Sequence, residues 1–145
     1  MVPQYKPESV LILGYAGGTT AGLIRLLYGD VPITAVDIEN CENRYGVDFI
    51  QADAEEFVKT CGHFDAVVVD LFQDDLFVNC SFVNKPEFAQ NLARIGNDII
   101  VNTLKNLDMS AYKIMKHIGT NKPTGSSNLI YYYEVKKIPN LHPHK

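Results

Sequence analysis

The sequence is poor in cysteine and contains no long apolar run. Its three cysteines, Cys41, Cys61 and Cys80, are odd in number and widely spaced, and they form no CxxC pair. This pattern argues against a disulfide framework and a zinc site, so we expect no metal and a reducing, cytoplasmic setting. No run is long enough to span a bilayer, and the first residues, MVPQYKPES, lack the apolar segment of a secretion signal.

Positive charge is also scarce. The chain carries 13 basic and 17 acidic residues, for a formal net charge of −4. This balance argues against a broad phosphate-binding surface, so we expect neither nucleic acid nor a membrane as a partner. Its 145 residues suit one domain, and we predict a single domain over residues 1–138 with a flexible tail over residues 139–145.

The most informative stretch is VLILGYAGGTT, residues 10–20. Four apolar residues, Val10–Leu13, run into a glycine-rich bend, and an apolar-periodic segment, Ala21–Tyr28, follows. This order predicts a buried parallel strand, a tight turn and a helix. Glycines in such a turn let the backbone pass close to a ligand at the helix N-terminus. The stretch therefore favours a nucleotide-type pocket; the alternative is that its glycines serve only tight strand-to-helix packing.

An acidic residue follows the second predicted strand. The strand Pro32–Val36 ends at Asp37, roughly 20 residues past the glycine bend, where nucleotide-binding βαβ units carry an acid that accepts hydrogen bonds from ribose hydroxyls. The alternative is a solvated loop carboxylate. The polar stretch Ile38–Gly46 that follows is too poor in apolar period for a helix, and we expect a loop or a single turn.

Two more aspartates follow the third and fourth predicted strands. Asp53 comes after the strand Val47–Gln51, where it could bind a base amino group or cap the predicted helix Glu55–Thr60. The strand Phe64–Val69 ends at Asp70. Because ligands of open α/β sheets bind at the carboxyl ends of the strands, these aspartates are candidate site residues.

The second half of the chain begins with an apolar loop, LFQDDLFVNCSFVN, over residues 71–84. It carries Asp74 and Asp75 among apolar residues, and it is too apolar to lie wholly in water, which predicts a lid on the pocket or a subunit interface. The elements expected after it are the helix Lys85–Arg94, the strand Asp98–Asn102, the helix Leu107–His117, the connector Gly119–Ser127 and a last strand, Asn128–Lys136, that is partly exposed or at an edge. The alternation of strands and helices predicts an α/β, Rossmann-like three-layer sandwich, with a mostly parallel sheet and an antiparallel last strand.

Together these motifs resemble the class I S-adenosylmethionine-dependent transferases, and within them the spermidine synthase-like branch. The resemblance covers residues 8–105, with VLILGYAGGTT as the cofactor loop, AVDIEN around the ribose-binding acid, QADAEEF as the adenine-side motif and FDAVVVDLF as the fourth strand with its terminal acid. Dinucleotide enzymes prefer GxGxxG, whereas Ala16 and Thr19 occupy the second and third glycine places here. A nicotinamide-dependent oxidoreductase therefore ranks lowest among the alternatives.

The resemblance implies S-adenosylmethionine, or its decarboxylated form, as co-substrate. It implies that Gly14, Gly17 and Gly18 line the methionine part, that Asp37 holds the ribose and that Asp53 binds the adenine amino group. The cofactor-binding residues expected on this basis are Gly14, Tyr15, Ala16, Gly17, Gly18, Asp37, Ile38, Asp53, Ala54 and Asp70.

The sequence also departs from the spermidine synthases. Gly17 stands where they carry an Asp that holds the cofactor's amino-alkyl end, and Gln73 stands where a second acid takes a proton from the amine, with Asp74 one step later. Their N-terminal β-domain is absent from this sequence. The cofactor half of the resemblance is thus more complete than the amine half.

The predicted function is a small transferase that moves an aminopropyl or methyl group to an amine-type acceptor such as a polyamine. Asp70 would orient the amine and Asp74 would act as the base. The alternatives are a nucleoside-binding or interaction protein of the same fold without catalysis, and a small-molecule methyltransferase. The apolar 71–84 loop and the tyrosine-rich last strand suggest a homodimer, although scattered exposed apolar residues need no partner.

Overall fold

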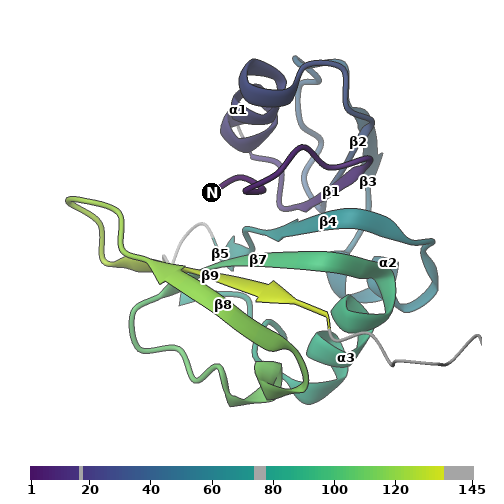
Figure 1. Cartoon of the computed structure of the whole chain (residues 1–145). Coiled ribbons are helices and arrows are strands. Elements are labelled where there is room, and N and C mark those ends of the chain that lie inside the picture. Colours follow the sequence, from purple (N-terminus) through teal and green to yellow (C-terminus); the bar gives the residue numbers. More distant parts are fainter. Residues whose placement is uncertain (17, 74–77, 136–145) are drawn as a thin grey trace, which may run out of the picture.

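The computed structural model describes residues 1–16, 18–73 and 78–135. Within these ranges one sheet is formed by seven strands: β1 (Val10–Leu13), β2 (Ile33–Asp37), β3 (Asp48–Gln51), β4 (Phe64–Val69), β7 (Gly96–Leu104), β8 (Lys116–Asn121) and β9 (Asn128–Glu134). Their order is β3-β2-β1-β4-β7-β9-β8 (Figure 1). The strands β1, β2, β3, β4 and β7 are parallel to one another, and β9 is antiparallel to β7 and to β8. The predicted α/β fold, with its antiparallel last strand, is confirmed.

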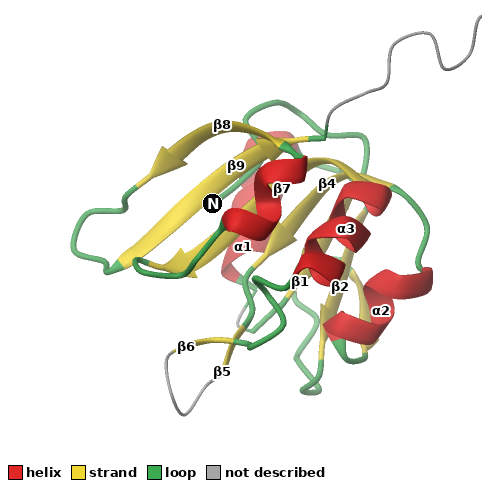
Figure 2. Ribbon diagram, turned by 90° about the horizontal axis from the view of Figure 1, so that it is seen from below, coloured by secondary structure: helices red, strands yellow, loops and turns green. Residues whose placement is uncertain are grey.

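Helices cover both faces of the sheet and give the three predicted layers. α1 (Thr19–Tyr28) lies on one face, while α2 (Ala54–Thr60), α3 (Pro86–Ile95) and the 3-10 turn η1 (Ser110–Ile114) lie on the other (Figure 2). Alternate residues of β1 are buried in the two resulting cores, and all four are at most 1% exposed. A strand that is covered on both faces must be apolar throughout, which explains the run at residues 10–13.

The described part of the 71–84 segment is attached to the body of the fold. Its strands β5 (Phe72–Gln73) and β6 (Val78–Asn79) form a two-stranded antiparallel ribbon. The side-chain amide of Asn79 donates to the carbonyl oxygens of Leu71 at 3.2 Å and Asn102 at 3.1 Å, which ties this ribbon to β7. These residues therefore form a fixed part of the sheet's carboxyl edge.

The predicted helix Leu107–His117 is wrong. The structure has the short turn η1 there, followed by β8. The Asp108 carboxylate accepts a hydrogen bond from the Ser110 backbone nitrogen at 2.9 Å and starts the turn. The chain then pairs with β9, whose backbone groups would otherwise lack partners on that side. Sheet pairing overrides a local helical pattern that is too short to persist alone.

This extra strand changes two further expectations. The predicted connector Gly119–Ser127 begins inside β8, where Gly119 follows a shift in the register between β8 and β9. β9 is not an edge strand, because β8 covers its outer side. Its Tyr132 and Tyr133 are only 8% and 5% exposed, whereas Tyr131 is partly exposed, so the strand is partly exposed as expected.

Residues 136–145, which include the predicted tail over residues 139–145, lie outside the described ranges. None of the helices within those ranges is both long enough and apolar enough to cross a bilayer.

Candidate functional site

A cavity of about 590 Å³ lies at the carboxyl edge of the sheet, where β1, β2 and β4 end and α2 begins. Seven of the residues expected to bind a cofactor line it: Gly14, Ala16, Asp37, Ile38, Asp53, Ala54 and Asp70. The others that line it are Glu39, Cys41, Leu71, Phe72, Gln73, Cys80 and Phe82. Its volume is within the range of small-molecule sites, and the three aspartates that end different strands meet around it.

Gly14 forms the floor where β1 and β4 end side by side. Its φ is 91°, and a Cβ atom at this position would lie 2.1 Å from the carbonyl oxygen of Asp70. The Asp70 backbone nitrogen donates to the Leu13 carbonyl at 2.8 Å, which holds the two strand ends at this spacing. Only glycine fits here, because any side chain would displace the start of the Asp70 turn.

Tyr15 and Gly18 are not among the residues that line the cavity. Tyr15 is only 4% exposed, and its ring packs against Phe49 with the centroids 5.9 Å apart. Gly18 caps α1 in a left-handed conformation, and a Cβ there would lie 2.9 Å from the Tyr15 hydroxyl oxygen. These residues support the bend through packing, which is the role that the alternative interpretation gave to the glycines. Gly17 lies outside the described ranges.

The carboxylate of Asp37 binds the backbone of the glycine bend. Its Oδ2 accepts hydrogen bonds from the backbone nitrogens of Tyr15 at 2.9 Å and Ala16 at 3.1 Å, while Oδ1 accepts one from Glu39 at 2.9 Å. A carboxylate has about four acceptor positions, and the side chain of Cys41 also interacts with this one. The role of Asp37 in binding the bend was not predicted from the sequence. It could have been, because a glycine-rich bend has backbone N–H groups without partners and Asp37 ends the neighbouring strand.

Asp53 caps α2 and also lines the cavity. Its Oδ1 accepts a hydrogen bond from the Glu55 backbone nitrogen at 2.9 Å, so the capping alternative describes one of its contacts. Ile38 also lines the cavity and is 67% exposed, which provides an apolar surface suited to a base. Phe72 and Phe82, from the 71–84 segment, add apolar surface to the cavity. The sequence predicted a lid or an interface for this segment but did not single out these two residues.

Asp70 lies between this cavity and a second one. Its Oδ1 accepts a hydrogen bond from the Asn102 side-chain nitrogen at 3.1 Å. Burial raises the pKa of the Asp70 carboxyl, while the bond from Asn102 and the charge of the N-terminal ammonium oppose this rise. A partly buried carboxyl with a raised pKa in a cavity is suited to accepting a proton. Asp74, the expected base, lies outside the described ranges.

The second cavity has a volume of about 520 Å³ and continues along the carboxyl edge toward β9. Its lining residues are Asp70, Phe72, Gln73, Asn102, Leu104, Ser127 and Asn128. The first three of these also line the larger cavity. Sequence reasoning did not identify Asn102, Ser127 or Asn128, because nothing near them in the sequence marks a site.

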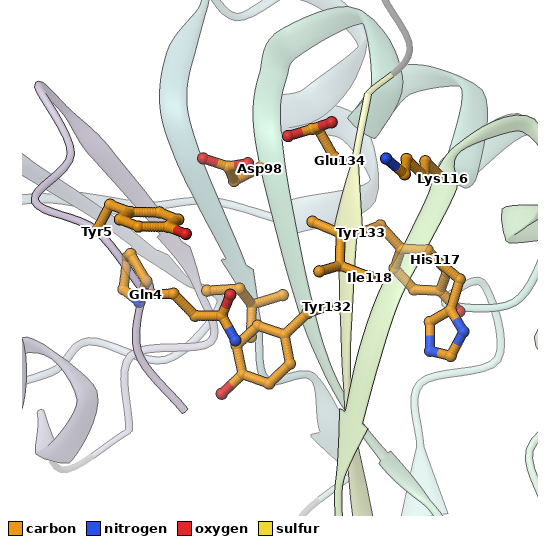
Figure 3. A pocket seen from close by; sticks show the side chains of 11 residues that line it. Gln4, Tyr5, Asp98, Lys116, His117, Ile118, Tyr132, Tyr133 and Glu134 are labelled. Carbon is orange, nitrogen blue, oxygen red and sulfur yellow. The ribbon is translucent and has the colours of Figure 1, made fainter.

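A third hollow, of about 450 Å³, lies on the face of the sheet over β7, β9 and β8. Figure 3 shows Tyr5 and Tyr132 at this hollow, with Asp98 and Glu134 at one end. Asp98 lies near the start of β7, so these acids are toward the amino ends of the parallel strands. Ligands of open α/β sheets bind at the opposite edge, where the cavity of about 590 Å³ lies, so that cavity is the candidate site.

The strand order, the glycine bend and the acid-tipped strands define the class of fold as a Rossmann-like α/β sandwich with its site at the carboxyl edge. No protein-family model matches the sequence, and none of the curated proteins is similar enough in sequence to count as a match.

Solved structures share this fold. Human methyltransferase-like protein 13 in complex with SAH aligns with a TM-score of 0.73 at 15% identity, over 94% of this chain and 76% of that one. A TehB-like SAM-dependent methyltransferase from Corynebacterium glutamicum aligns with a TM-score of 0.64 at 12% identity, over 91% and 82%. MtNAS in complex with MTA and tNA aligns with 0.61 at 16%, over 91% and 55%. At these identities the likeness defines a methyltransferase-type fold.

Proposed function

We propose that this chain binds S-adenosylmethionine in the cavity at the carboxyl edge and transfers its methyl group to an amine-type acceptor. The observation that carries the proposal is the convergence of Gly14, Asp37, Asp53 and Asp70 on that cavity. The fold shared with methyltransferases, one of them solved in complex with SAH, supports it.

The residues of the cavity fit this co-substrate. Gly14 contributes only backbone to the cavity, because the place of a side chain is taken by the Asp70 carbonyl, and this backbone would face the methionine part. The carboxylates of Asp37 and Glu39, which both line the cavity, suit the two ribose hydroxyls. Ile38 offers an apolar surface for the adenine, and the Asp53 carboxylate is an acceptor for its amino group.

When bound, the co-substrate would supply a methyl carbon on a positively charged sulfur, so that the nitrogen lone pair forms the C–N bond, the C–S electron pair stays on sulfur and SAH is released. The chain's own task is to hold the acceptor nitrogen in line and to remove its proton. Asp70 is placed to accept this proton because it lines both cavities and its pKa is raised by burial.

Two further candidates have specific observations behind them. Aminopropyl transfer from decarboxylated S-adenosylmethionine is favoured by the structural likeness to MtNAS, which was solved in complex with MTA, the nucleoside that remains when the carbon chain is transferred. A binding protein without turnover is favoured by Gln73, a neutral residue that lines both cavities where the resemblance expects an acid.

Calorimetry with SAH tests the binding step. We expect Asp37→Ala to weaken SAH binding at least about tenfold, which corresponds to about 1.4 kcal/mol. The matched control is Asp48→Ala, since Asp48 is exposed at the start of β3, and it should bind as the wild type does. Absence of SAH binding by the wild-type chain would overturn the proposal.

Product analysis then separates the three candidates. The chain is incubated with S-adenosylmethionine, or with its decarboxylated form, and with putrescine or ethanolamine as acceptor. Formation of SAH from S-adenosylmethionine supports methyl transfer, and formation of MTA from the decarboxylated form supports aminopropyl transfer. Tight binding of SAH without either product supports the binding protein.

A further inference from the structure

We propose that the second cavity, on the far side of Asp70 from the glycine bend, is the acceptor subsite and that it binds a small primary amine. This inference rests on the proposed function and names the part of the site that the acceptor occupies. It adds Asn102 and Asn128, which come from β7 and β9, to the residues that act on the acceptor.

A chain of side-chain hydrogen bonds crosses three neighbouring strands at this cavity. The Asn128 side-chain nitrogen donates to Asn102 Oδ1 at 3.1 Å, and the Asn102 side-chain nitrogen donates to Asp70 Oδ1 at 3.1 Å. Because Asn128 already donates to the amide oxygen of Asn102, the NH2 group of Asn102 is the part that turns toward Asp70. Asn102 is therefore a positioning residue that fixes the carboxylate through one of its two oxygens.

The oxygens at this cavity that this chain of hydrogen bonds leaves without a donor are acceptors. Among the described residues, none donates a hydrogen bond to Asp70 Oδ2 or to Asn128 Oδ1. Asp70 is also the one charged side chain among the residues that line this cavity, and the N-terminal ammonium that acts on it is not among them. A ligand that fits must donate hydrogen bonds and is favoured by a positive charge, which describes an amine and excludes a carboxylate or a phosphate.

The rest of the lining limits the size of the amine. Phe72 and Leu104 provide apolar surface for a short carbon chain, and Ser127 and Gln73 provide additional polar contacts. Asp70, Phe72 and Gln73 line both cavities, so an amine on Asp70 lies where the two meet. Asp70 then both binds the charged amine and takes one of its protons, which frees the nitrogen lone pair that forms the new bond to carbon.

Nuclear magnetic resonance on the SAH complex tests this subsite without turnover. Putrescine and ethanolamine are titrated into the complex, with 1,4-butanediol as the neutral analogue of putrescine. We expect the two amines to shift the side-chain amide signals of Asn102 and Asn128 and the carboxyl signal of Asp70. The diol should bind at least about tenfold more weakly, a difference of about 1.4 kcal/mol.

A matched pair of variants separates this role from a structural one. Asn97 donates to Asp65 Oδ1 at 3.1 Å, which is the same kind of contact between β7 and β4 at the other end of these strands. We expect Asn102→Ala to weaken putrescine binding about tenfold and to raise the pKa of Asp70, while SAH affinity changes less than about threefold. Asn97→Ala should leave putrescine binding unchanged. If Asn102→Ala does not fold, Asn128→Ala takes its place.

The outcomes are distinguishable. Loss of SAH binding by the wild-type chain overturns the proposed function and the subsite with it. SAH binding with no amine-induced shift at Asn102, Asn128 and Asp70 overturns the subsite alone, as does equal binding of the diol. Equal weakening by Asn97→Ala and Asn102→Ala would show an effect on the fold and would also overturn it.

Discussion

The α-carbon of Gly14 lies so close to the Asp70 carbonyl that a Cβ atom would come within 2.1 Å of the oxygen. Gly14 follows β1, and Asp70 follows β4, the neighbouring parallel strand. This contact joins the bend expected to hold the co-substrate to the carboxylate expected to hold the acceptor. The proposed chemistry therefore depends on the close approach of the ends of β1 and β4, which only a glycine at position 14 allows.

We expect Gly14→Ala to lower the free energy of unfolding by more than about 3 kcal/mol, because it combines a left-handed backbone with a clash against a fixed carbonyl. The control is Gly29→Ala, since Gly29 also has a positive φ, 71°, but nothing within 4 Å of an added Cβ. It should lose only about 1–2 kcal/mol. Urea unfolding measures both, and equal losses would contradict the role given to the Gly14–Asp70 contact.

Asp37 should control the order of the glycine bend as well as ligand binding. In Asp37→Ala the backbone N–H groups of Tyr15 and Ala16 lose their acceptor, at a cost of about 1–3 kcal/mol. We expect faster amide hydrogen exchange at these two residues, with an intermediate effect for Asp37→Asn, which keeps one acceptor oxygen. Unchanged exchange at Tyr15 and Ala16 in Asp37→Ala would be inconsistent with the hydrogen bonds described.

The carboxyl of Asp70 should make stability depend on pH. Burial raises its pKa in the folded chain above the unfolded value, which is near 4. Its stabilising contribution is therefore complete below the unfolded pKa and is lost as the pH rises through the folded pKa. Asp70→Asn removes this loss, and it should be more stable than the wild type at pH 7 by about 1.4 kcal/mol for each unit of pKa elevation.

Urea unfolding between pH 3 and pH 7 checks this expectation. The advantage of Asp70→Asn should shrink toward pH 3, whereas Asp48→Asn, at an exposed position, should follow the wild type at each pH. A variant that is less stable than the wild type at pH 7 would show that the carboxylate is not destabilised by burial.

Cys41 offers a chemical probe of the cavity proposed to bind the co-substrate. It lines that cavity, whereas Cys61 follows α2 and is not among the lining residues. Burial raises the pKa of both thiols, and the Asp37 charge adds to the effect at Cys41. We expect SAH to slow alkylation of Cys41 by iodoacetamide and to leave Cys61 unaffected, as measured by peptide mass mapping. Equal slowing at both would indicate a general change in stability.

Local sequence patterns were sufficient where neighbouring residues decide the structure. The apolar run before Gly14 gave β1, the glycines gave the bend, and the placement of Asp37, Asp53 and Asp70 after their strands put all three at one edge, where they line one cavity. The same reasoning failed for residues 107–117, where the 3-10 turn η1 and the start of β8 replace a predicted helix, and β8 forms because β9 offers unpaired backbone groups.

The sequence by itself therefore determined the layered α/β fold and the edge of the sheet that carries the site, since both follow from short-range periodicity and from strands that end in acids. Only the tertiary structure decided what those acids contact. Asp37 holds a bend 21 residues away, and Asp70 receives a hydrogen bond from Asn102, 32 residues away. Such pairings depend on which strands become neighbours, and no local pattern records that choice.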